Sequence, residues 1–427
     1  MKRTDWFVHD RFGMFIHWGL YAIPSRGEWV RCHEEISVED YQKYFDTFDP
    51  VNYEPKKWAK LAKKAGMKYA VMTAKHHDGF CLFDSKLTEY KATNTPAKRD
   101  LIREYIEAFR DEGIKVGLYY SIIDWHHPDY PAYKDRTHPM RNNEKFKDVK
   151  FDFDNYLEYM HEQVRELLTN YGKIDVMWFD FAYDNPDRED KFKSMRGPIW
   201  KSDELVKMIR ELQPEILIDD RLGGSASDPE TKLEYGDFAS PEQIVPPTGV
   251  VNPQGESLIW EACITLNDNW GHCSEDRNFK DTKTVIRSLI ECVSKNGNML
   301  LNVGPNAKGE IEETEIKILE EVGEWMRKNG ESIYGTGISE FPKPEWGRFT
   351  QKGKTLYAHI FDRGIGPVSL TNLNGKVEEE ARRLWDDSET TLTRPWMAAS
   401  FPNDVFIDLK SNKLPDEAST VIKITLK

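Results

Sequence analysis

The sequence predicts an α/β protein: a (β/α)₈-like TIM barrel, regular or irregular, followed by a small C-terminal antiparallel β-sandwich. Apolar strand-like runs alternate with amphipathic helices through roughly the first 330 residues, a pattern that requires parallel strands. Polar and aromatic residues follow several of these strands, which favours a closed barrel over an open sheet. After about residue 340 short apolar runs and turn residues take over. We expect the barrel over residues 1–338 and the sandwich over residues 339–427.

Seven apolar runs are the predicted strands of the barrel. The run Ile174–Asp180 is nearly continuous in apolar residues, as is typical of a strand covered on both faces. No glycine-rich phosphate-binding motif follows the first strand, which argues against a nucleotide-binding sheet. An eighth strand, or an irregular replacement for it, is not identified. The seven predicted strands are 13–21, 68–75, 115–121, 174–180, 215–220, 257–264 and 298–303.

The predicted helices follow from apolar residues spaced at the helical period. In segment 55–66, Trp58, Leu61, Ala62 and Ala65 share one face, and a proline begins the first turn. Segments 99–113 and 153–172 repeat the pattern and each ends at or beside a glycine. Further helices are expected near 202–213, 282–295 and 312–329, whereas the C-terminal strands are expected at 356–361, 368–370, 405–409 and 421–426.

Composition restricts the possible partners and location. The net charge of −14 argues against a nucleic acid or an anionic membrane, because either would repel the protein. The 13 tryptophans suit carbohydrate binding, although core packing explains them equally well. The five scattered cysteines indicate free thiols, and no signal peptide or membrane span is visible, so we expect a cytoplasmic protein. A homo-oligomer is left open.

Asp180 is the most informative residue because a carboxylate ends a buried strand. An α/β barrel places catalytic groups at this position, so Asp180 is a candidate nucleophile or general base. A helix N-cap or a loop turn explains an aspartate after a strand about as well. The run alone leaves these two interpretations open.

Other strand ends carry side chains that suit a sugar. Histidine, tyrosine, arginine and carboxylate groups bind hydroxyls, and aromatic rings cover the apolar face of a sugar. The histidine pair His76 and His77 suggests metal ligands, but adjacent residues diverge and no metal-ligand spacing is present, so we predict no metal and no cofactor. The rim residues include His17, Glu28, Trp29, His76, His77, Tyr119, Tyr120, Arg221 and Trp270.

Four motifs resemble the α-L-fucosidases of glycoside hydrolase family 29. They are FGMFIHWGLY at 12–21, AKHHDGF at 74–80, GLYYS at 117–121 and VSKNGNMLLNVGP at 293–305. The resemblance extends from about residue 6 to residue 335, the whole predicted barrel. It implies a retaining exo-glycosidase that removes terminal α-L-fucosyl residues from a fucosylated glycan by double displacement.

The resemblance also implies roles for individual residues. Asp180 matches the nucleophile, Tyr119 or Tyr120 a tyrosine near the anomeric centre, and Arg221 an arginine near the acid/base loop. Trp270 matches an aromatic that faces the methyl group of fucose. The residues that match hydroxyl-binding positions or accompany them in the pocket are His17, Glu28, Trp29, His76, His77 and Trp178.

The acid/base is not fixed by the resemblance. The loop that carries this residue varies in length, so two glutamates are candidates. Glu242 is favoured, with Glu234 as the alternative. Phe181 stands where the family more often has glycine, and His272 where it more often has tyrosine. These departures keep an α-L-galactoside open as substrate. An inactive carbohydrate-binding protein and a metal-dependent hydrolase would also be compatible with these residues.

Overall fold

The computed structural model describes residues 2–224, 233–411 and 413–427. Its larger part is built on a curled sheet of seven parallel strands in the order β7-β4-β3-β2-β1-β9-β8. Each of these strands corresponds to one of the predicted apolar runs, which confirms the barrel-like α/β fold. They are β1 (Phe12–Ile16), β2 (Tyr69–Lys75), β3 (Lys115–Ser121), β4 (Val176–Asp180), β7 (Leu217–Ile218), β8 (Trp260–Thr265) and β9 (Gly297–Val303).

An irregular segment over residues 237–243 fills the gap between β7 and β8. The Asp237 amide donates to the Ile218 carbonyl at 2.7 Å, and the Cys263 amide donates to the Pro241 carbonyl at 3.1 Å. Bridges in this segment run parallel to both neighbouring strands. It therefore takes the place of the eighth strand and closes the barrel. Its Asp-Phe-Ala-Ser-Pro-Glu-Gln sequence carries none of the β-branched, alternating pattern that predicts a strand.

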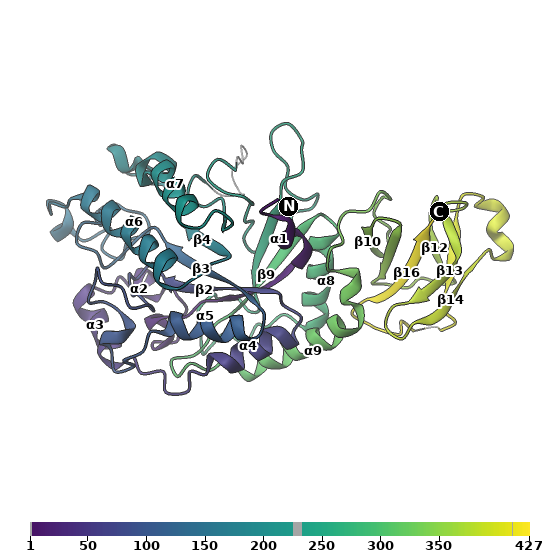
Figure 1. The fold of residues 1–427 in the computed structure, drawn as a ribbon, viewed down its shortest axis with the longest axis horizontal. Helices are drawn as coiled ribbons and strands as arrows, with labels where there is room; N and C mark the ends of the chain where they lie inside the picture. The colour runs from purple at the N-terminus through teal and green to yellow at the C-terminus, as the bar shows by residue number, and fades with distance from the viewer. Residues whose placement is uncertain (1, 225–232, 412) are drawn as a thin grey trace.

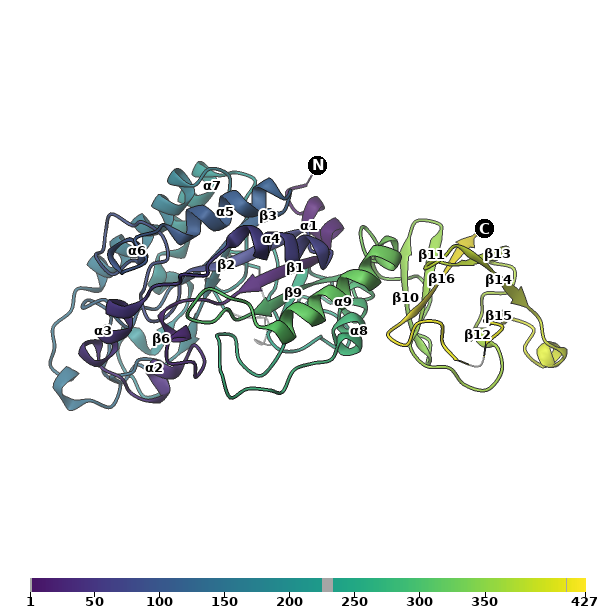
Figure 2. The ribbon, with the colours of Figure 1, turned by 90° about the horizontal axis from the view of Figure 1, so that it is seen from below.

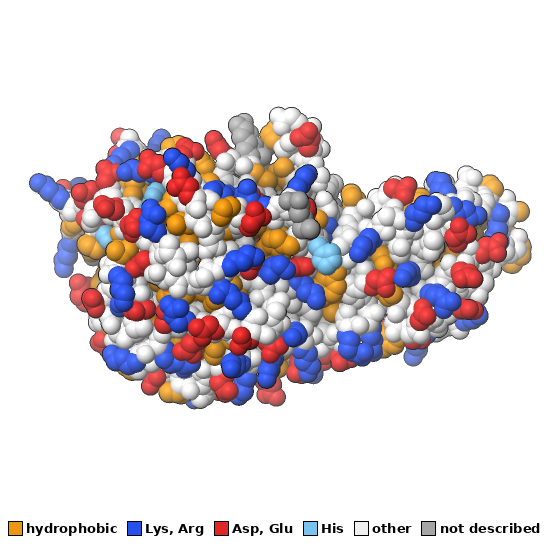
Figure 3. All heavy atoms as spheres, viewed as in Figure 1, with side chains coloured by type: hydrophobic (Ala, Val, Ile, Leu, Met, Phe, Trp, Pro, Cys, Tyr) orange, Lys and Arg blue, Asp and Glu red, His pale blue; other side chains and the backbone are white. Residues whose placement is uncertain are grey.

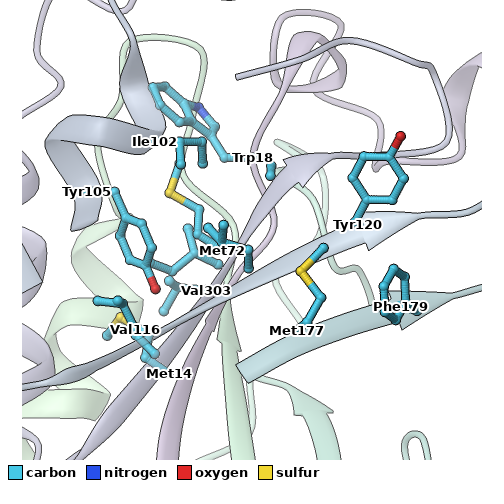
Figure 4. Packing of buried hydrophobic residues seen from close by; sticks show 14 of the residues in the cluster. Met14, Trp18, Met72, Ile102, Tyr105, Val116, Tyr120, Met177, Phe179 and Val303 are labelled. Atoms are coloured by element: carbon cyan, nitrogen blue, oxygen red, sulfur yellow. The ribbon is translucent and has the colours of Figure 1, made fainter. Parts of the chain in front are cut away.

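Side chains alternate between the two faces of the barrel wall. The outward-facing residues pack under the helices, as Met14, Met72, Val116 and Met177 do in Figure 4. The inward-facing residues form a separate cluster inside the barrel. That inner cluster contains Phe15, Tyr69, Val71, Tyr119, Val176, Trp178, Leu217, Phe238, Cys263 and Leu300.

Helices cover the outside of the barrel, as Figures 1 and 2 show. Asp100, Asp152 and Asp281 cap the N-termini of α5, α6 and α8 through their carboxylates. No helix within the described ranges is long and apolar enough to cross a membrane. The covering helices are α4 (Pro55–Lys64), α5 (Leu101–Asp111), α6 (Phe153–Asn170), α7 (Ser202–Leu212), α8 (Thr282–Val293) and α9 (Glu313–Asn329), and α1 (Asp5–Asp10), α2 (Val30–His33) and α3 (Val38–Thr47) precede them.

The first strand is shorter than its apolar run predicts. It ends at Ile16, and a short 3₁₀ turn at Leu20–Ala22 follows where the prediction continued the strand to residue 21. His17 therefore stands just beyond the end of β1, with its side chain on the same face as Phe15. Because the strand ends early, the chain continues from here into the loop that carries Glu28 and Trp29.

The C-terminal part is one continuous antiparallel sheet around its own core, in the order β10-β11-β16-β13-β14-β15-β12. Trp346 Nε1 donates to the Ser369 carbonyl at 2.8 Å, which brings the two edges of the sheet together. Three strands of this sheet were not predicted from the sequence, because their solvent-facing side chains are charged or polar. The strands are β10 (Gly347–Lys352), β11 (Thr355–Ile360), β12 (Val368–Leu370), β13 (Val377–Arg383), β14 (Ser388–Thr393), β15 (Val405–Asp408) and β16 (Thr420–Leu426).

Helices α8 and α9 join this sheet to the barrel (Figure 1). Arg287 Nε of α8 donates to the Ala418 carbonyl at 2.9 Å. Trp325 Nε1 of α9 donates to the Ser419 carbonyl at 3.2 Å. The placement of the domain boundary between residues 338 and 339 stays a prediction.

Candidate active site

A cavity lies at the carboxyl end of the barrel strands. Ten of the predicted site residues line it, together with three other residues. The lining residues are Phe15, His17, Glu28, Trp29, His76, His77, Tyr119, Trp178, Asp180, Phe181, Glu242, Cys263 and Trp270.

Asp180 points into this cavity from the end of β4. It lies two residues after Trp178, so its side chain shares the inward face of the strand. Tyr119 Oη donates to Asp180 Oδ2 at 2.7 Å, and Arg221 Nη1 donates to Oδ1 at 3.0 Å. His77 Nε2 lies 3.8 Å from Oδ2. No helix begins at Asp180, because β5 (Tyr183–Asp184) follows, so the helix-cap interpretation is excluded.

Opposing effects set the proton affinity of Asp180. Burial raises the pKa of its carboxyl above that of a free aspartate, and the Arg221 guanidinium counteracts this rise. The nearby Glu242 carboxylate raises the pKa further, whereas the hydrogen bonds from Tyr119 and from the Phe181 amide lower it. The ionised form of this buried carboxylate is therefore stabilised by Arg221, Tyr119 and the Phe181 amide.

Arg221 joins two carboxylates across the cavity. Its Nη1 binds Asp180, and its Nη2 donates to Glu242 Oε2 at 3.0 Å. Nε donates to Ser240 Oγ at 2.9 Å, and Nη2 also donates to the Ser240 carbonyl at 3.0 Å. Ser240 in turn donates its amide to Asp220 Oδ1 at 3.1 Å. The guanidinium is therefore held in one orientation, with one carboxylate on each terminal nitrogen.

Glu242 and Glu234 occupy different environments. Glu242 belongs to the irregular segment that closes the barrel, forms a bridge with Cys263 and lines the cavity. Its side chain is 44 % exposed, so it stands at the mouth of the cavity. Glu234 is exposed to solvent and does not line the cavity. The geometry thus places Glu242, and not Glu234, beside Asp180 and Arg221.

The histidines at the bottom of the cavity are buried and neutral. His17 Nδ1 lies 2.7 Å from Asn302 Oδ1, and burial lowers the pKa of His17 to about 3. His77 Nδ1 lies 2.7 Å from Ser121 Oγ, and burial lowers its pKa as well. Burial also lowers the pKa of His76, whose Nδ1 has no hydrogen-bond partner among the described residues. Neutral rings can both donate to and accept from hydroxyl groups.

Glu28 and Trp270 complete the floor of the cavity from two loops. The Gly271 amide donates to Glu28 Oε2 at 2.8 Å, and burial raises the pKa of the Glu28 carboxyl. The Trp270 ring centroid lies 5.0 Å from that of His17 and 5.8 Å from that of Phe15. An aromatic face therefore lies beside the polar groups, as carbohydrate recognition requires.

Tyr120 and His272, both singled out in the sequence, do not line the cavity. Tyr120 is on the opposite face of β3 from Tyr119, and its hydroxyl donates to Gln163 Oε1 of α6 at 2.7 Å. Neighbouring residues of a strand point to opposite faces, so Tyr119 faces the cavity and Tyr120 does not. His272 Nδ1 lies 3.2 Å from Glu312 Oε1 and does not line the cavity.

Sequence reasoning missed several supporting residues. Asn302 follows the inward-facing Leu300 by two positions on β9, so strand alternation could have identified it. Ser240 carries no such signal, because its segment has no strand pattern. Among the residues that the structure describes, no group of three or more histidine, cysteine, aspartate or glutamate side chains could hold a metal ion.

Comparisons with known proteins agree with this arrangement. The family model described as alpha-L-fucosidase matches residues 1–331. The chain resembles the solved structure of alpha-L-fucosidase isoenzyme 1 from Paenibacillus thiaminolyticus, with 64 % identity, a TM-score of 0.95 and coverage of 100 % of this chain and 99 % of that one. Tissue alpha-L-fucosidase of Bos taurus is 28 % identical over 83 % of this chain and 74 % of its own length.

A further similar structure bears on the reaction. It is a family 29 alpha-L-fucosidase from Bacteroides thetaiotaomicron, solved as a trapped covalent intermediate with 2-fluoro-fucosyl fluoride. This chain is 30 % identical to it, with a TM-score of 0.85, and the similarity covers 100 % of this chain and 96 % of that one.

Proposed function

This chain belongs to the alpha-L-fucosidase family, and from that premise we propose that Asp180 and Glu242 are the two carboxyl groups of its reaction. The protein is an α-L-fucosidase, a glycoside hydrolase, and the covalent intermediate of its relative is consistent with a retaining mechanism. The observation that carries the assignment is the Arg221 guanidinium, which binds both carboxylates at 3.0 Å.

In the first step Asp180 attacks the anomeric carbon and Glu242 protonates the departing oxygen. The result is a fucosyl ester on Asp180 and a free leaving group. Arg221 and Tyr119 hold the Asp180 carboxylate in its ionised form and aim it into the cavity. Because Glu242 contacts Arg221 in the free enzyme, its carboxyl group must turn from the guanidinium to the leaving oxygen.

In the second step Glu242 deprotonates a water molecule, which attacks the ester and releases fucose with its original configuration. His17, His76, His77 and Glu28 hold the sugar hydroxyls in this proposal, and their burial supports it. The fucosidase descriptions of the family and its relatives do not favour the α-L-galactoside alternative.

The test is hydrolysis of aryl α-L-fucosides followed by NMR of the newly released sugar. A retaining reaction gives α-L-fucose first, before mutarotation. Release of β-L-fucose first would contradict the double displacement, and turnover of α-L-galactosides at a higher kcat/KM would contradict the substrate assignment. The same assay detects an inactive carbohydrate-binding protein, which would bind fucose without turnover.

The substrate partner is a fucosylated glycan. We further propose a reducing, cytoplasmic location, which the five free cysteines support. Figure 3 shows acidic and basic side chains interspersed over one face of the molecule, without the large basic patch that nucleic acid requires. The exposed Trp396, Met397 and Phe401, in and directly after the 3₁₀ turn Trp396–Ser400 of the C-terminal part, support a homo-oligomer, which sedimentation of the purified protein would test.

A further inference from the structure

Phe181, the residue after Asp180, has a backbone conformation that side chains rarely adopt. Its φ is +83°, in the left-handed region that favours glycine. The chain is fixed on both sides of this residue. Asp180 is held by Arg221, and the Tyr183 hydroxyl donates to the buried Asp135 carboxylate. Such a conformation costs free energy and persists only where its surroundings impose it, which is common at functional sites.

The Phe181 ring lies on the wall of the cavity, where it is only half-buried. Its centroid lies 4.6 Å from that of His77, at an interplanar angle of 77°. The Trp29 ring is at 5.2 Å and the Tyr183 ring at 5.7 Å. Phe181 and Trp29 therefore form a continuous aromatic surface at the edge of the cavity, in contact with a proposed sugar-binding histidine.

Burial separates the cavity into a floor and a mouth. His17, His76 and Tyr119 on the floor are at most 3 % exposed. Trp29 and Phe181 are partly exposed, and the Glu242 side chain is 44 % exposed. Since the general acid must reach the departing oxygen, the position of Glu242 marks the side on which the leaving group lies. The Phe181 and Trp29 rings are therefore partly open to solvent, as Glu242 is, whereas the floor is closed.

We propose that the Phe181 ring, together with Trp29, is the wall of the leaving-group subsite and selects leaving groups with a flat or apolar face. Aryl rings and the apolar face of a pyranose are the chemical classes that such a wall accepts. The strained backbone at Phe181 holds the ring across the mouth. This assignment rests on the proposed roles of Asp180 and Glu242, because they define which side of the sugar departs.

The experiment compares substrates that differ only in the leaving group. α-L-Fucosyl fluoride has no ring to contact the wall, whereas an aryl α-L-fucoside and a fucosyl disaccharide do. In Phe181→Ala and Phe181→Gly we expect kcat/KM for the aryl fucoside and the disaccharide to fall about tenfold relative to the fluoride. The inhibition constant of free fucose, which reports the floor of the cavity, should stay within about twofold.

The matched control is Trp385→Ala, which removes an exposed ring from the turn between β13 and β14, away from the cavity. It should leave the ratio of kcat/KM for the aryl fucoside to that for the fluoride unchanged. If both Phe181 variants leave this ratio unchanged, as they would if kcat/KM fell equally for the fluoride and the aryl fucoside, the assignment is overturned. Failure of the proposed function looks different from failure of this assignment. In that case the wild-type enzyme would turn over none of these substrates, or Asp180→Gly would remain active.

Discussion

Arg221 and Asp180 form a buried ion pair inside the barrel, with Arg221 Nη1 lying 3.0 Å from Asp180 Oδ1. The other terminal nitrogen of the same guanidinium binds Glu242. Arginine suits this position because its planar fork binds two acceptors in fixed directions and stays charged when buried. Its contacts therefore connect the two carboxyl groups proposed for the reaction.

Asp180→Gly should reduce turnover of aryl α-L-fucosides by at least about a thousandfold, because the covalent intermediate cannot form. Added azide should fit the space of the missing carboxylate and yield β-L-fucosyl azide, with inverted configuration. Product analysis by NMR checks this outcome. Wild-type activity in the variant, or an azide of retained configuration, would contradict the nucleophile assignment.

Glu242→Ala should affect substrates according to how much protonation their leaving group needs. Turnover of a fucosyl disaccharide should fall by roughly a hundredfold or more, whereas α-L-fucosyl fluoride should react at close to the wild-type first-step rate. Glu234→Ala is the matched control, because this glutamate is exposed and lies outside the cavity. The reverse ranking of the two variants would transfer the acid/base role to Glu234.

Arg221→Met should move the acid limb of the kcat/KM profile to higher pH. The nucleophile acts when ionised, so activity is lost as pH falls through the pKa of Asp180. Arg221 lowers that pKa, and its removal should raise the limb by on the order of one pH unit. Arg221→Lys keeps a positive charge and should shift the limb less. A limb that stays in place or moves to lower pH would show that Arg221 does not control Asp180.

Glu261 is a buried carboxyl group inside the barrel, where Tyr69 and Trp178 donate hydrogen bonds to it. Burial raises the pKa of Glu261 from 4.5 to about 8. The folded protein binds this proton more tightly than the unfolded chain, so its contribution to stability is complete below the unfolded pKa. That contribution is lost as pH rises through the folded pKa.

Glu261→Gln replaces the protonated acid by an uncharged group of similar shape. It should flatten the fall in the free energy of unfolding between pH 5 and pH 9, a change on the order of a few kcal/mol. Urea unfolding of both proteins at several pH values measures this. Equal pH dependence in the variant and the wild type would show that Glu261 is not the responsible group.

Phe181→Gly and Phe181→Ala should differ in stability although both lose the same ring. At a φ of +83° glycine is unstrained and alanine is not. We expect the glycine variant to have the larger free energy of unfolding, by about 1 kcal/mol. The difference in urea midpoints at constant m-value measures it. A more stable alanine variant would mean that the backbone relaxes out of the left-handed region.

Much of the fold could be predicted because its signals are local. Apolar runs and helical periods depend on neighbouring residues. All seven barrel strands and the helices from α4 to α9 therefore lie at the positions that the sequence predicts. The strands β10, β13 and β14 were missed because one face of each is polar and solvated. The irregular segment 237–243 was missed because its place in the barrel comes from backbone pairing with two distant strands.

The sequence by itself determined the strand that ends in Asp180, the residues that follow the other strands and the family resemblance. Only the tertiary structure decided that Glu242 lines the cavity and Glu234 does not, since this depends on where the closing segment meets Cys263. It likewise decided that Tyr119, and not Tyr120, lines the cavity, because Tyr119 pairs in register with the inward-facing Trp178. Local patterns fix which elements form, whereas register, closure and the direction of a side chain depend on contacts between residues far apart in the chain.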